Sequence, residues 1–185
     1  MMIYYSQGYR MIRQLQNNFI NEEIWILTFG GAFQRSGIYG DIDTDDPRRI
    51  LFRNDIKHYV EEIILPQYQT NLIDGDTHIK NILNFSEWSK EHSEIINGGY
   101  LKMGISQKLI NLYLKYQWCL GNIQQPPHCP FDRIIIQKLG YNPIPSWTKL
   151  DSEKEYREFV LKAKKMADYS NKSIAEWELS VFQRR

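Results

Sequence analysis

The stretch QKLINLYLKYQWCL, residues 107–120, decides the fold class of this chain. Its apolar residues recur every three or four positions, which is the spacing of one face of an α-helix. That stripe consists of Leu109, Leu112, Tyr113, Tyr116 and Leu120. The same periodicity dominates the rest of the chain and alternating runs are few, so we expect an all-α fold with little strand.

Outward from this stretch, cap and stop signals divide the chain into about seven or eight predicted helices. Gly30-Gly31, Pro66, Gly98-Gly99 and Gly121 act as stop signals. Predicted helices cover residues 7–18, 21–30, 47–65, 77–97 with a second start signal at Ser86, 107–120 and 132–139. Two more helices are predicted, one that starts at Asp151 or Ser152 and one that starts at Ser173. No linker separates these segments, which predicts a single compact helical domain over residues 1–185.

Composition narrows the function classes. The chain has 185 residues, of which 42% are hydrophobic and 14% aromatic, enough to build a core, so a wholly disordered chain is excluded. Its two cysteines, Cys119 and Cys129, cannot form a disulfide framework or a four-cysteine metal site. We therefore expect no metal, no cofactor and a cytoplasmic location. Runs of about 18 apolar residues are lacking, so no membrane association is expected.

Positive and negative charges nearly balance over the whole chain, but one segment is basic. The formal net charge is +1, from 23 basic and 22 acidic side chains, so a nucleic-acid site would have to be local. A local excess of basic over acidic residues occurs between Gly98 and Gly140, where Asp132 is the single acid. The basic residues of this segment are Lys102, Lys108, Lys115, Arg133 and Lys138.

Two short motifs in this segment have a recognisable layout. Gly104-Ile105 is followed by Lys108 at the start of the predicted helix, and Pro130-Phe131-Asp132 opens the next one. This layout resembles the helix-hairpin-helix DNA glycosylases that remove oxidised purines. The pattern departs from that family at Ser106, which stands where the second hairpin glycine belongs, and in the longer gap between Lys108 and Asp132.

The resemblance implies a base-excision enzyme, a hydrolase that repairs duplex DNA. It assigns Lys108 as the nucleophile that attacks the sugar and Asp132 as its acidic partner, because a buried amine and a carboxylate suit that chemistry. Backbone amides at Gly104 and Ser106 would bind a phosphate. Further contacts to DNA would come from Lys102, Lys115, Arg133 and the ring of Trp118.

Two other hypotheses stay open. Arg53-Asn54 followed by His58 resembles the motif of the HEPN ribonucleases, which are small all-α proteins. In that family arginine and histidine from two subunits meet and cleave RNA by acid–base chemistry, which suits an imidazole near pH 7. The second is a non-catalytic helical interaction module. In that case Lys108 and Lys115 are ordinary surface residues and Asp132 is only a helix N-cap.

Overall fold

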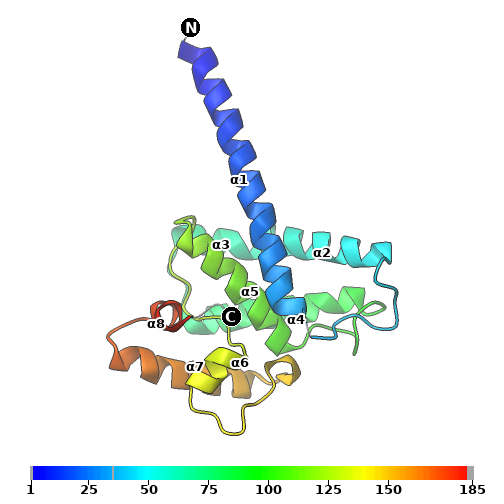
Figure 1. The fold of residues 1–185 in the computed structure, drawn as a ribbon, viewed down its shortest axis with the longest axis vertical. Coiled ribbons are helices and arrows are strands. Elements are labelled where there is room, and N and C mark those ends of the chain that lie inside the picture. Colours follow the sequence, from blue (N-terminus) through cyan, green and yellow to red (C-terminus); the bar gives the residue numbers. More distant parts are fainter. Residues whose placement is uncertain (1, 35, 183–185) are drawn as a thin grey trace.

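The computed structural model describes residues 2–34 and 36–182, and it is all-helical, which confirms the predicted fold class. Across those residues the structure has no strand, only an isolated bridge between Tyr39 and Ile96. The α-helices are α1 (Met2–Phe33), α2 (Pro47–Tyr59), α3 (Leu65–Thr70), α4 (Gly75–Trp88), α5 (Met103–Cys119), α6 (Arg133–Lys138), α7 (Glu153–Tyr169) and α8 (Ile174–Val181) (Figure 1). Shorter helical turns are η1 (Val60–Ile64), η2 (Ser89–His92) and η3 (Trp147–Lys149).

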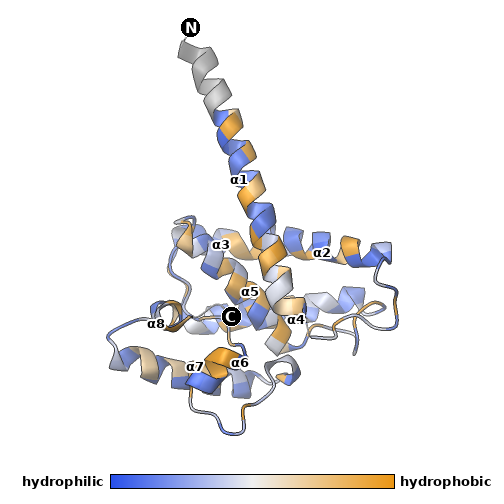
Figure 2. Cartoon of the chain, viewed as in Figure 1, coloured by the Kyte–Doolittle hydropathy of each residue, from blue (hydrophilic) through white to orange (hydrophobic). Residues whose placement is uncertain are grey.

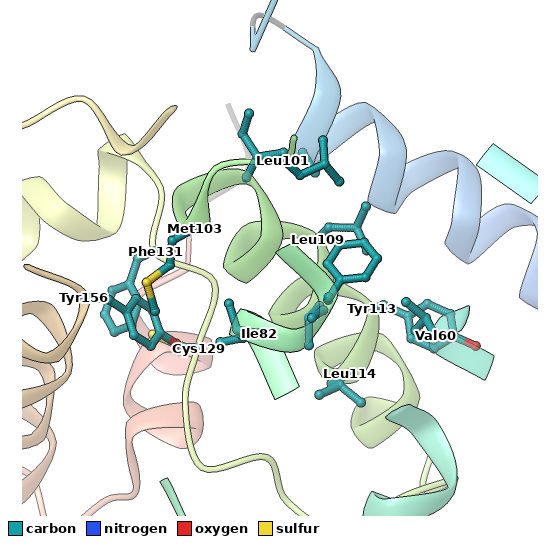
Figure 3. Close-up of a cluster of buried hydrophobic side chains, with 14 of the residues drawn as sticks. Val60, Ile82, Leu101, Met103, Leu109, Tyr113, Leu114, Cys129, Phe131 and Tyr156 are labelled. Atoms are coloured by element: carbon teal, nitrogen blue, oxygen red, sulfur yellow. The ribbon is translucent and has the colours of Figure 1, made fainter. Parts of the chain in front are cut away.

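Helix α5 lies at the centre of the molecule, in contact with α1, α4, α7 and η3. It begins at Met103, four residues earlier than predicted, and nearly all of its residues are buried rather than one stripe of them. Leu109, Tyr113 and Leu114 of this helix join a hydrophobic cluster that Phe131 and Tyr156 extend toward the C-terminal helices (Figure 3). Because the helix is covered from several sides, its polar side chains are buried as well.

Helix α1 is continuous where the sequence predicted two helices. Asn21 does not cap a second helix, because its side chain donates to Glu61 at 2.7 Å and accepts from the Tyr113 hydroxyl. Gly31 was predicted to end a helix but lies inside α1. Its role is close packing against α5, because a Cβ there would lie 2.5 Å from the Leu112 side chain. Beyond the body of the molecule, residues 10–20 project into solvent with both apolar and polar side chains (Figure 2).

The segment from α2 to α4 follows the predicted caps in part. Asp46 caps α2 directly before the predicted start at residue 47, and its side chain accepts from the Arg48 amide. The helical path then continues past Pro66 through the π-turn η1 and α3, because the wider turn accommodates a residue without an amide proton. Asp74, and not Thr77, caps α4, and no new helix starts at Ser86.

The C-terminal helices begin where the sequence predicted. Asp132 caps α6, Ser152 caps α7, and Ser173 forms a reciprocal capping box with Glu176 at the start of α8. Helix α8 returns to pack against α7. Within the part of the chain that the structure describes, none of the helices combines the length and apolarity that crossing a bilayer requires.

Candidate active site

Lys108 and Asp132 are in direct contact. The Lys108 Nζ donates to Asp132 Oδ2 at 2.9 Å, although 24 residues separate the two in sequence. The Lys108 side chain is 8% exposed and that of Asp132 is 26% exposed, so the pair lies at the boundary between core and solvent. The structure thus brings together the two residues to which the resemblance assigns the chemistry.

Asp132 has a second set of contacts. Its Oδ1 accepts from the amides of Ile134 and Ile135, both at 3.0 Å, and this caps α6. Burial disfavours the charged carboxylate, but the Lys108 charge and these two amides together hold the pKa of Asp132 below its ordinary value. The residue is therefore a fixed anion beside the amine.

Both side chains line an open groove of about 530 Å³, which we call the lysine groove. One wall is the last turn of α1, at Gly30 and Gly31, together with Gln34 directly after the helix. The other walls are Lys108, Asp132, Arg133 and Ile134 together with residues 144–148. Of the predicted DNA contacts, the exposed Arg133 is the one that this groove contains.

Gln107 holds the backbone from which Asp132 projects. Its side chain donates to the Phe131 carbonyl at 2.8 Å and accepts from the Phe131 amide at 3.1 Å. It also donates to the Gly104 carbonyl, so one buried amide ties the start of α5 to the start of α6. Sequence reasoning missed this residue, because a bond to backbone atoms leaves no pattern of residue types.

A buried polar network lies behind Gln107. Asn111 donates to Gln107 and to the Tyr156 hydroxyl, both at 3.2 Å, and its oxygen contacts His78 Nε2 at 2.8 Å. Burial lowers the pKa of His78 to about 4. Burial, together with the neighbouring His78, also lowers the pKa of His128 well below its ordinary value. Both imidazoles are therefore neutral parts of the core.

The predicted phosphate-binding hairpin is wrong. Gly104 and Ser106 lie in the first turn of α5 and are buried. Their amides are already used, because Gly104 donates to the Leu150 carbonyl at 2.8 Å and Ser106 donates to the Lys102 carbonyl at 3.0 Å. Glycine is required at 104 for close approach, since a Cβ there would lie 1.7 Å from the Trp147 carbonyl oxygen.

The other predicted contacts are not gathered at the lysine groove. Lys115 is buried and pairs with Glu178, its Nζ lying 2.9 and 2.7 Å from the two carboxylate oxygens. Its expected surface position is therefore wrong. Lys102 and Trp118 are half-buried, and Trp118 packs against the core. Two of the five cations of this segment, Lys108 and Lys115, are thus paired with acids inside the fold.

The residues of the other hypotheses lie elsewhere. Arg53 and His58 are exposed on α2, and the Arg53 Nε donates to the Tyr39 hydroxyl. The ribonuclease hypothesis needs a second subunit and stays a prediction. Cys119 is exposed whereas Cys129 is buried. Among the described side chains, no three histidines, cysteines or acids are grouped as a metal site requires.

Comparison of the chain with family models, with curated proteins and with solved structures found no match. The function of the lysine groove is therefore inferred from its own geometry, in which an amine and a carboxylate are fixed in contact at the edge of an open groove.

Proposed function

We propose that this chain is a DNA base-excision enzyme in which Lys108 attacks the sugar of a damaged nucleotide and Asp132 assists. The observation that carries the proposal is the 2.9 Å contact between the Lys108 amine and the Asp132 carboxylate inside one groove. The layout of the two residues, one near the start of α5 and the other capping α6, also resembles that of helix-hairpin-helix glycosylases.

The proposed reaction begins with a proton transfer. Lys108 is a nucleophile only after its ammonium loses a proton, and Asp132 Oδ2 is the base within hydrogen-bond distance. The nitrogen lone pair then forms a bond to C1′ of the sugar. The bond from C1′ to the base breaks, and its electron pair leaves with the base, which takes up the proton that Asp132 received from Lys108. Asp132 thereby becomes a carboxylate again, and its negative charge stabilises the positive charge that develops on the sugar.

The size and walls of the lysine groove suit this reaction. A base inside a duplex cannot reach a buried amine, so the damaged nucleotide has to rotate out of the stack. The groove volume of about 530 Å³ falls within the range of sites that hold small ligands. Trp147 and Ile144 offer it apolar walls, and the cation of Arg133 lies at its edge, where a phosphate can be bound.

Covalent trapping tests the proposal. An amine bound to C1′ becomes an imine when the sugar ring opens, and borohydride reduces that imine to a stable amine. We expect a covalent adduct between the wild-type chain and a duplex that carries an oxidised purine, and none with K108Q. K108R is the folding control, because it retains a cation beside Asp132 but does not form the imine. K149Q, which removes an exposed lysine outside the groove, should trap like the wild type.

Asp132→Asn separates chemistry from folding. Asparagine still caps a helix, but the buried Lys108 amine loses its anionic partner, so we expect stability to fall by about 1–3 kcal/mol. Base removal in a single turnover should slow by about 100-fold or more, because the anion beside the amine is lost. The proposal is contradicted if duplexes with oxidised purines or an abasic site yield neither adduct nor free base. RNA cleavage that R53A or H58A abolishes would support the ribonuclease hypothesis instead.

A further inference from the structure

A second open groove, of about 880 Å³, adjoins the lysine groove. We call it the arginine groove. It runs between the C-terminal half of α1, the loop of residues 37–42 and one face of α2. Gly30 and Gln34, at the end of α1, line both grooves, so the two meet at that turn. A ligand that leaves the lysine groove over the end of α1 therefore enters the arginine groove.

The lining residues of the arginine groove that the structure describes include cations but no acid. Arg49, Arg53 and Lys57 follow one another at intervals of four residues, which places them on the same face of α2. Within the described ranges 2–34 and 36–182, none of the side chains that line it is an aspartate or glutamate, in a chain whose net charge is only +1. Lys57 pairs with Glu22, whereas over residues 2–34 and 36–182 no carboxylate forms an ion pair with Arg49 or Arg53.

The guanidinium groups of Arg49 and Arg53 are held in place by aromatic rings and backbone. Arg49 stacks on the ring of Tyr39 at 4.0 Å and donates to the Asp43 carbonyl at 3.2 Å. Arg53 donates to the Tyr39 hydroxyl at 3.2 Å and lies 5.4 Å from the centre of the Phe29 ring. Fixed, planar guanidinium groups lose little conformational entropy on binding and match the geometry of a phosphate.

We propose that the arginine groove binds the phosphate backbone of the same DNA strand whose damaged nucleotide enters the lysine groove. This inference rests on the proposed function and adds the path that the substrate strand takes. The row from Arg49 to Lys57 spans eight residues, or about 12 Å at 1.5 Å per residue, which corresponds to about three nucleotides at 3.4 Å each. Arg49 and Arg53 each contact a phosphate, and neither reaches the reacting sugar.

Salt dependence of duplex binding tests the phosphate contacts. Each phosphate contact contributes about 0.9 to the slope of log affinity against log salt concentration. For R49Q/R53Q we therefore expect that slope to fall by about 1.8 and affinity to fall about tenfold or more at low salt. The matched control is R48Q/R157Q, which removes two exposed arginines that are paired with acids outside the groove. That control should leave the slope unchanged.

The direction of the strand is tested with asymmetric abasic duplexes. Shortening the duplex on one side of the lesion should cost as much affinity as R49Q/R53Q does, and the double variant should lose nothing further on that short duplex. Shortening on the other side should leave the effect of R49Q/R53Q intact. Equal effects on both short duplexes would overturn the proposed path.

Gly30→Glu tests the junction between the grooves. An added Cβ at Gly30 meets nothing within 4 Å, so a side chain can start there without displacing a neighbour, and glutamate places an anion where the strand crosses α1. We expect G30E to weaken duplex binding about tenfold while G30A binds like the wild type. Wild-type affinity in G30E would overturn the inference.

The failure of this inference is distinguishable from failure of the proposed function. If base removal occurs but R49Q/R53Q leaves the salt slope unchanged, the arginine groove is not the DNA path. If the variant lowers the slope and no duplex yields an adduct, the groove binds DNA but Lys108 chemistry is absent. Loss of binding to poly-glutamate alone, with unchanged DNA affinity, would assign the groove to an acidic protein and overturn the inference.

Discussion

His78 shows how one buried residue can make the stability of the fold depend on pH. Its Nε2 faces the Asn111 side-chain oxygen, which only accepts, so Nε2 carries the proton. The other nitrogen, Nδ1, then accepts from the Tyr68 hydroxyl at 2.7 Å. A second proton, on Nδ1, would require the Tyr68 hydroxyl to stop donating to the ring. Burial keeps the ring neutral, although the hydrogen bond to Asn111 acts in the opposite direction.

We predict that the chain loses stability between pH 6.5 and 4. An unfolded histidine takes up its proton near pH 6.5, whereas His78 in the folded chain has a pKa of about 4. In that window the unfolded state binds more protons, so the free energy of unfolding falls as pH falls. The shift corresponds to about 3 kcal/mol, and His128 acts in the same direction.

Urea unfolding measured from pH 7.5 to 4 checks this prediction. H78Q removes the titrating group, so its loss of stability over that range should be smaller than that of the wild type. H58Q removes an exposed histidine and should retain the full loss. An H78Q variant whose acid dependence equals that of the wild type would contradict the prediction.

At the scale of the elements, two glycines in helices have opposite environments. A Cβ at Gly104 would lie 1.7 Å from the Trp147 carbonyl oxygen, where α5 and η3 cross, and backbone atoms there cannot move aside singly. We expect G104A to cost about 3 kcal/mol or more by overpacking. G30A meets nothing and should gain about 0.5–1 kcal/mol from helix propensity. Thermal unfolding of both variants measures the difference, and equal effects would contradict this account.

Local signals predicted four of the described helix starts, and long-range packing determined features that they did not predict. The caps at Asp46, Asp132, Ser152 and Ser173 act within three residues, so sequence alone located these starts. The continuity of α1 depends instead on a contact between Asn21 and Glu61, 40 residues apart. Side-chain partners at that separation leave no local pattern, and the residue at which a second helix was predicted to start lies inside one continuous helix.

The candidate site was also predicted only in part from the sequence. The residue types at 108 and 132 identified the pair that the structure brings into contact. The hairpin was mispredicted because Gly104 matches a turn in sequence but serves close packing in the fold. Lys115 looked like a surface cation because its partner, Glu178, lies 63 residues further along the chain.

At the scale of the whole molecule, α8 is fastened to the central helix by a buried ion pair. The Lys115 and Glu178 side chains are only 10% and 3% exposed. Burial raises the pKa of Glu178, while the charge of Lys115 acts against that rise. Lys115 also lies 4.0 Å from the ring of Phe182, at the end of α8. The pair thus joins the C-terminal end of the described chain to α5.

Variants of this pair test whether Lys115 stabilises the fold or contacts DNA. K115M leaves a buried carboxylate without its partner, so we expect a loss of about 3–5 kcal/mol. K115M/E178L removes both charges and should restore stability to within about 1 kcal/mol of the wild type, because apolar side chains of similar volume fill the site. Denaturant unfolding measures both effects. The folded double variant should bind duplex DNA with the wild-type salt slope, since the Lys115 amine is enclosed and makes no phosphate contact. A slope lower by about 0.9 in K115M/E178L would instead make Lys115 a DNA contact and require α8 to move away from α5 on binding.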